Sequence, residues 1–168
     1  RLPDESWQNA PEEGHGRILG ELCHFVDLAR FLVGADIRTV QASAAAVTQG
    51  TCDDLTVSLG FADGSLATVA YTALGDTAYS KELIEGFAGG TVVTINDFRA
   101  MTVVSGGKES RGGRQMEQDK GHGAELAAFV AAVAAGGPAP ADEAELVQSS
   151  FATIAVLESL QRGGPVAL

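Results

Sequence analysis

The stretch Leu55–Ala73, LTVSLGFADGSLATVAYTA, carries the clearest fold signal in the chain. Apolar side chains occupy every second position of its first seven residues: Leu55, Val57, Leu59 and Phe61. This period of two is typical of a strand with one buried face. The pair Asp63-Gly64 accepts the positive φ angles of a tight turn, and Leu66–Ala73 supplies a returning strand. The stretch therefore predicts an antiparallel hairpin.

Working outward, alternation predicts one strand before the hairpin and three after it: Val40–Ala46, Lys81–Phe87, Thr91–Ile95 and Phe98–Val104. Helical spacing predicts three helices, at Arg17–Val33, Ala124–Ala135 and Asp142–Leu160. The glycine-rich, charged run Ser105–Lys120 is expected to be a mobile loop. The order of elements indicates an α+β fold, an open and mostly antiparallel sheet of five or six strands with helices packed on one face. We expect residues 1–168 to form a single domain.

Composition excludes several classes of protein. The 168 residues are 45% hydrophobic and 20% charged, which is typical of a globular chain. A net charge of −11 would repel phosphate backbones and anionic lipids, so neither a nucleic-acid partner nor a membrane is expected. The N-terminal residues Arg1–Glu5 do not resemble a targeting signal. The two cysteines have no framework spacing, which favours reduced thiols and a cytoplasmic location.

One polar stripe runs along the first expected helix. At 100° per residue, four polar residues fall within an arc of roughly 120°: Arg17, Glu21, His24 and Asp27. In one interpretation these residues form a satisfied structural network or the solvent side of the helix. In the other, His24 faces a cleft, where a neighbouring carboxylate tunes it for proton transfer near neutral pH.

Other possible sites are weaker. Gly14–Gly20 has the spacing GxGxxxG and follows no apolar strand, so it does not predict a dinucleotide site. The residues around Cys23 and Cys52 lack the ligand spacing of a zinc site, and no metal is expected. Lys120 and His122 precede a helix, where they could approach an anionic group or serve only in capping and solvation.

The segment GRILGELCHFVDLARFLVG at residues 16–34 resembles the start of the C-terminal domain in the glucose-fructose oxidoreductase, inositol dehydrogenase and rhizopine-catabolism (Gfo/Idh/MocA) family. The similarity continues through further segments along the chain: DDLTVSLGFADGS, KELIEGF, NDFR, DKGHGAEL and ESLQRGGPV. The nearest branch resembles domains found in long zinc-alcohol-dehydrogenase-like oxidoreductases. The resemblance implies a dihydrodipicolinate-reductase-like C-terminal domain, whose open sheet covers the substrate and builds oligomers.

The resemblance also implies roles for individual residues. His24 matches the family's helix histidine, which takes part in proton transfer at the substrate hydroxyl, and Asp27 matches the acid three residues later. A common family pattern has an aspartate four residues before the histidine, where this chain has Gly20; Glu21 is then a substitute from the other side. Arg17, His15, Lys120 and His122 are the implied substrate contacts.

We therefore expect the substrate and assembly domain of an oxidoreductase that interconverts a hydroxyl and a carbonyl on a sugar-like or polyol substrate. The resemblance implies that NAD or NADP binds to an N-terminal Rossmann domain, which also carries a catalytic lysine. The chain alone is thus expected to bind no dinucleotide and to be inactive. The alternative is a non-catalytic domain for oligomerisation or ligand binding, which Gly20 favours. The small, uncharged residues on the second face of the sheet predict a homodimer or higher homo-oligomer.

Overall fold

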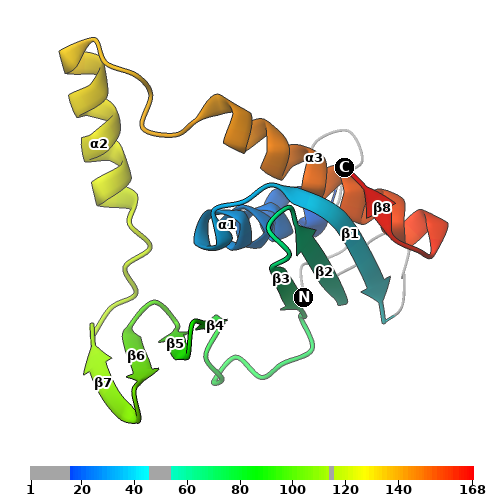
Figure 1. The fold of residues 1–168 in the computed structure, drawn as a ribbon, viewed down its shortest axis with the longest axis horizontal. Helices are drawn as coiled ribbons and strands as arrows, with labels where there is room; N and C mark the ends of the chain where they lie inside the picture. The colour runs from blue at the N-terminus through cyan, green and yellow to red at the C-terminus, as the bar shows by residue number, and fades with distance from the viewer. Residues whose placement is uncertain (1–15, 46–53, 114–115) are drawn as a thin grey trace. The chain divides into compact units, whose positions relative to one another are not determined.

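The computed structural model describes residues 16–45, 54–113 and 116–168 (Figure 1). The chain divides into two compact units. The first unit comprises Arg1–Leu74 together with Ala141–Leu168, and the second comprises Gly75–Pro140. The C-terminal helix and strand thus return to the unit that contains the N-terminal helix.

The first unit is a four-stranded antiparallel sheet with two helices on one face (Figure 1). Its elements in chain order are η2 (Ile18–Leu22), α1 (Cys23–Val33), β1 (Ile37–Ala44), β2 (Leu55–Phe61), β3 (Leu66–Tyr71), α3 (Glu143–Arg162) and β8 (Val166–Ala167). The strand order in the sheet is β3-β2-β1-β8. Helix α3 packs on β1 and against α1, so the two helices meet above the middle of the sheet.

The predicted hairpin is confirmed. Leu59 pairs with Ala67, and the Phe61 N–H donates to the Ser65 carbonyl at 3.0 Å. Gly64 has a φ of +87°, a conformation that a side chain would strain. The backbone and side chain of Ser65 donate to the Asp63 carboxylate and lower the pKa of that carboxyl.

The alternation in β2 separates core from surface as predicted. All four apolar residues of this strand are buried under the helices: Leu55, Val57, Leu59 and Phe61. The intervening Thr56 and Ser58 are exposed. The neighbouring strands add small, exposed residues to the same outer face: Ser43, Thr68 and Ala70. One face of the sheet is therefore the core, and the other presents uncharged side chains that are mostly short, together with the exposed Leu66 and Gln41.

The second unit contains a separate four-stranded antiparallel sheet and one helix. Its elements are β4 (Leu83–Ala88), β5 (Thr91–Asn96), β6 (Ala100–Ser105), β7 (Lys108–Gly112) and α2 (His122–Ala135). Gly89-Gly90 forms the two-residue turn between β4 and β5, with φ angles of +54° and +76°. Gly106-Gly107 forms a second two-residue turn, with φ angles of +57° and +73°. Two positive φ angles are the signature of the turn that joins neighbouring strands without splaying them.

The α+β class and the antiparallel pairing are confirmed, and the details of the strands differ from the prediction. The described residues form eight strands in two sheets of four, whereas the sequence predicted five or six strands in one sheet. The expectation of a mobile loop over Ser105–Lys120 is wrong for Lys108–Gly112, which forms β7. Charged residues concealed this strand because its side chains are exposed and need no apolar alternation. Within the described segments, no helix has both the length and the apolarity that crossing a membrane requires.

Candidate functional site

The N-terminal helix begins with a π-helical turn and continues as an α-helix. The Cys23 N–H donates to the Ile18 carbonyl, a bond across five residues that marks the π turn. Ile18, Leu22 and Val26 are all buried and fix the rotation of the helix on the sheet. The helix ends at Gly34, which has a φ of +73° and donates from its N–H to the Arg30 carbonyl at 2.8 Å.

The rotation of this helix places His24 and Asp27 on the outside of α1, where both are exposed. They line a pocket between α1 and α3 with a volume of about 340 Å³. The pocket residues come from both helices: Leu19, Cys23, His24, Asp27, Leu146, Ser149, Ser150, Thr153 and Ile154. A histidine and an acid three residues apart on one helix face are close neighbours. The structure thus brings two of the predicted site residues into one pocket.

A hydrogen bond crosses this pocket from α3 to α1. The Ser149 hydroxyl donates to Oδ1 of Asp27 at 2.7 Å. Ser149 is buried, whereas Asp27 is exposed. The Thr153 hydroxyl donates to the Ser149 carbonyl at 2.8 Å, one helical turn further along α3. The Asp27 carboxylate is therefore hydrogen-bonded to α3, the helix that forms the opposite wall of the pocket.

Cys23 lies in the same pocket next to His24. Burial raises the pKa of its thiol; hydrogen bonds from the backbone of His24 and Cys23 oppose this rise, and the negative charges of Glu21 and Asp27 add a smaller increase. The thiol is consequently protonated at neutral pH. A protonated thiol is a poor nucleophile and a poor metal ligand, so Cys23 contributes apolar surface to the pocket.

The other two residues of the predicted stripe do not line this pocket. The Arg17 guanidinium lies over the Tyr71 ring, 5.0 Å from its centroid, and Phe25 packs against the same ring at 6.2 Å. Glu21 is half-buried in the π turn. The stripe assumed 100° for every residue, and the π turn at Ile18–Leu22 breaks that regular spacing.

The remaining predicted contacts have other surroundings. Lys120 belongs to the second unit, where its ammonium group pairs with the buried Glu82 carboxylate at 2.6 Å. Gln118 donates to the same carboxylate at 2.7 Å and to Asp97 at 3.1 Å. His122 is the first residue of α2 and is exposed. His15 lies outside the described residues.

Sequence reasoning missed Ser149 as part of the site. The signal was the series of small polar residues on the buried face of α3: Ser149, Thr153 and Ser159. A hydroxyl on an apolar helix face needs a partner, which points to a cross-helix hydrogen bond. The described residues contain no group of three or more side chains arranged to hold a metal ion.

Comparison with families of known domains gives the decisive match. The model of the GFO/IDH/MocA C-terminal domain matches residues 1–85, about half of the chain. The chain belongs to this family. Comparison with curated protein sequences finds no match. For this GFO/IDH/MocA domain the clearest likenesses are therefore to solved structures.

Three of those structures illustrate the likeness. An aldose-aldose oxidoreductase from Caulobacter crescentus, complexed with glycerol, has a TM-score of 0.83 at 15% identity over 100% of this chain and 52% of its own. An NAD binding oxidoreductase from Klebsiella pneumoniae has a TM-score of 0.83 at 16% identity over 99% of this chain and 54% of its own. An oxidoreductase from Agrobacterium radiobacter in complex with NAD+, L-tartaric acid and magnesium has a TM-score of 0.72 at 20% identity over 88% and 47%.

At these identities the likeness establishes the fold. The chain spans about half the length of the structures it matches. The matched region therefore covers one part of each of those longer chains.

Proposed function

We propose that this chain is the substrate-binding and assembly part of an NAD(P)-dependent oxidoreductase that interconverts a hydroxyl and a carbonyl on a sugar-like or polyol substrate. The observation that carries the proposal is the pocket between α1 and α3, where exposed His24 and Asp27 lie in a domain of an oxidoreductase family. The similarity to a structure with bound glycerol and to one with bound NAD+ and tartaric acid supports the substrate class. We also propose a cytoplasmic location.

The lining of the pocket suits a hydroxylated carbon chain. Leu146 and Ile154 offer apolar surface to the C–H groups of such a ligand. His24 and Asp27 offer polar atoms to its hydroxyls. An apolar wall with a few converging polar groups is the usual composition of a small-molecule site.

In this proposal His24 handles the proton of the reaction. Oxidation of an alcohol to a carbonyl removes a hydride from carbon and a proton from oxygen. A neutral imidazole nitrogen of His24 accepts the hydroxyl proton and returns it in the reverse direction. Asp27 orients the imidazole or the hydroxyl. A nicotinamide cofactor would supply the hydride acceptor.

We assign the cofactor to a Rossmann domain outside this chain. All strand pairs in the described residues are antiparallel. A dinucleotide fold needs parallel strands joined through a helix whose N-terminus meets the pyrophosphate. We therefore expect calorimetry of this chain with NADH to show no binding, and low-micromolar affinity would overturn the assignment.

The exposed face of the first sheet is the proposed assembly surface. It carries short uncharged side chains, including Thr56, Ser58 and Thr68, which allow a second sheet to approach to about 10 Å. We expect light scattering to report a dimer or higher oligomer that Ser58→Glu or Thr68→Lys dissociates. A chain that is monomeric at tens of micromolar, with no change in either variant, would contradict this surface.

A second candidate function is a non-catalytic domain that assembles subunits or binds a ligand. Gly20 favours it, because the position one turn before His24 carries no side chain. The two functions differ in what His24 does. We expect a protein carrying this chain with its Rossmann domain to reduce NAD(P) with at least one member of a polyol panel. His24→Ala should then lower the rate at least 100-fold, whereas equal rates would support the non-catalytic function.

A further inference from the structure

We propose that Ser149 is a positioning residue that clamps the Asp27 carboxylate beside His24, so that Asp27 serves as the acid partner of this histidine. The effect of this clamp on catalysis rests on the proposed function. The clamp itself is a structural feature and can be tested without activity. Ser149 belongs to α3, whereas the residues that the sequence predicts for proton transfer all belong to the N-terminal helix.

The first step is the asymmetry of the Asp27 carboxylate. Oδ1 accepts a hydrogen bond from the Ser149 hydroxyl at 2.7 Å, and this is the only hydrogen bond or ion pair of the Asp27 side chain among the described residues. Oδ2 consequently remains available to a group in the pocket. A carboxylate held by one oxygen presents the other in a fixed direction, which a freely rotating exposed aspartate would not do.

The second step is the rigidity of the donor. The Ser149 residue is 6% exposed, and it belongs to the buried face of a 20-residue helix. The Thr153 hydroxyl donates to the Ser149 carbonyl and adds a further bond one turn away. Helices α1 and α3 pack against each other, so the donor and the acceptor sit on two elements of one core. The clamp therefore has a rigid support.

The third step concerns the other side of His24. Position 20 lies one turn before His24 and is a glycine, and a Cβ built there would meet nothing within 4 Å. No side chain of this residue can orient the imidazole. Asp27 lies three residues after His24 on the same outer surface of α1, where side chains three apart meet. Glu21 also lies three residues from His24, but it is half-buried in the π turn and does not line the pocket. The acid partner therefore comes from the C-terminal side of the histidine.

The three residues divide the work of the site. The described residues show no hydrogen bond between His24 and Asp27. In the proposed substrate complex, one nitrogen of His24 donates to Oδ2 of Asp27 and the other nitrogen faces the substrate hydroxyl. Ser149 touches neither the substrate nor His24 in this arrangement. Its hydrogen bond restricts the side-chain conformations of Asp27, so that the carboxylate spends more time in the orientation that reaches His24. Supporting hydrogen bonds usually contribute to a site in this way.

The clamp can be measured in this chain by NMR, without any substrate. The two Hα–Hβ couplings of Asp27 should be unequal in the wild type, because the side chain keeps one rotamer. Ser149→Ala should average them toward equal values. The matched control is Ser159→Ala, which removes a fully buried serine hydroxyl of the same helix that bonds only to backbone groups of Ala42 and Gly164. This control should lower the melting temperature and leave the Asp27 couplings unchanged.

The catalytic consequence is measured in the longer enzyme as a double-mutant cycle. We expect Ser149→Ala to lower kcat/KM about 10-fold and Asp27→Asn about 30-fold. Because Ser149 acts through Asp27, the double variant should lose about 30-fold, whereas independent effects would multiply to about 300-fold. Ser159→Ala should retain kcat/KM within about twofold.

The outcomes separate the two proposals. Averaged Asp27 couplings in the wild type, or losses that multiply in the double variant, would overturn the positioning role of Ser149. Unequal couplings that collapse in Ser149→Ala, together with no oxidoreductase activity on any substrate, would keep the clamp and overturn the proposed function.

Discussion

The two sheets of this protein are built on different physical principles. Every buried apolar residue among the described positions belongs to the first unit, where β1 and β2 lie under α1 and α3. In the described part of the second unit the one buried residue is Glu82. The first sheet is therefore stabilised by a hydrophobic core, whereas the second relies on strand pairing, tight turns and polar contacts.

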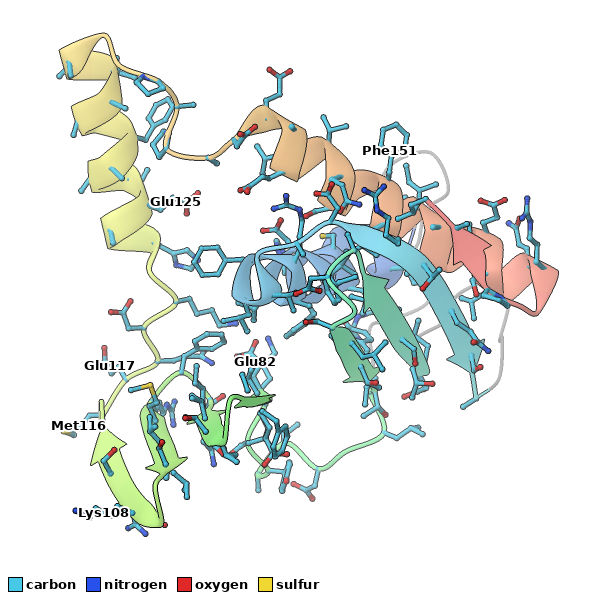
Figure 2. All side chains as sticks on the ribbon, in the orientation of Figure 1. Glu82, Lys108, Met116, Glu117, Glu125 and Phe151 are labelled. Carbon is cyan, nitrogen blue, oxygen red and sulfur yellow. The ribbon has the colours of Figure 1, made fainter. Side chains whose placement is uncertain are left out.

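The polar contacts of the second unit converge on one carboxylate. The Glu82 carboxylate accepts hydrogen bonds from the Gln118 amide and the Lys120 ammonium group. The backbone carbonyl of Glu82 accepts a hydrogen bond from the Asp97 N–H at 2.7 Å. Asp97 and Phe98 have φ angles of +53° and +51°, an uncommon conformation for residues with side chains. The Lys120 ammonium also lies 5.9 Å from the centroid of the Phe98 ring. Figure 2 labels Glu82 at the start of this sheet.

The largest expected difference between the sheets comes from shortening an apolar side chain in each. Leu59→Ala removes a fully buried side chain in the central strand β2 and should lower the free energy of unfolding by about 3 kcal/mol. Ile95→Ala in β5 removes a half-buried side chain of the same size class and should cost less than about 1.5 kcal/mol. Urea titration followed by circular dichroism measures both. Equal losses would mean that the second sheet has a core of similar strength.

The second prediction concerns a substitution that should destabilise the second unit and leave the first unit unchanged. Glu82→Gln leaves the Lys120 ammonium without its counter-charge and should destabilise the second unit by about 2 kcal/mol. Amide hydrogen exchange in β4 and β5 should accelerate roughly 30-fold, while exchange in β2 stays unchanged. Glu85→Gln, in the strand β4 that directly follows Glu82, is the matched control, because Glu85 is exposed. A similar acceleration in both variants would show that the buried ion pair is not what holds this unit.

The sequence predicted the first unit well because its core imposes a pattern. Burial of alternate residues in β2 produces the period of two, and the N-terminal helix ends at Val33, as predicted. The second unit lacks a strong core, so its last strand, β7, carries no alternation and was missed. The turn signal Gly106-Gly107 was present and would have identified the hairpin.

The candidate site was predictable only in part, for a related reason. Helical spacing identifies His24 and Asp27 on one surface, because both belong to one helix. The third member, Ser149, lies 122 residues away, and only the packing of α3 on α1 brings it to Asp27. The π turn that separates Arg17 from this group depends on how Ile18 and Leu22 fit the core, which local spacing does not encode.

The apolar outer side of α3 remains exposed next to this site. Figure 2 shows Phe151 projecting from the helix, and it is 60% exposed. Leu146, Val147 and Ile154 are also about half exposed and line a shallow hollow with it. The first unit is thus apolar both beneath α3 and on its outer surface.

A smaller effect is expected at the tight turns that help to stabilise the second unit. Gly107 has a φ of +73° at the end of a two-residue turn, and Gly107→Ala should cost about 1 kcal/mol because a Cβ is strained in that conformation. The loss should appear as faster amide exchange in β6 and β7. Ser110→Ala, in the exposed strand that follows, should have little effect on exchange. No change in the Gly107 variant would mean that the turn contributes little to the pairing of these strands.

The smallest expected effect has the opposite sign and lies in the first unit. Gly20 is exposed in the π turn, its φ is not positive, and an added Cβ meets nothing within 4 Å. Gly20→Ala restricts the unfolded chain without straining the folded one and should raise the free energy of unfolding by about 0.5 kcal/mol. A shift of the thermal midpoint of a few degrees would measure it. Because the packed core fixes the position of this helix, the gain should occur without change in the Asp27 couplings; a destabilised variant would instead show that the π turn requires glycine.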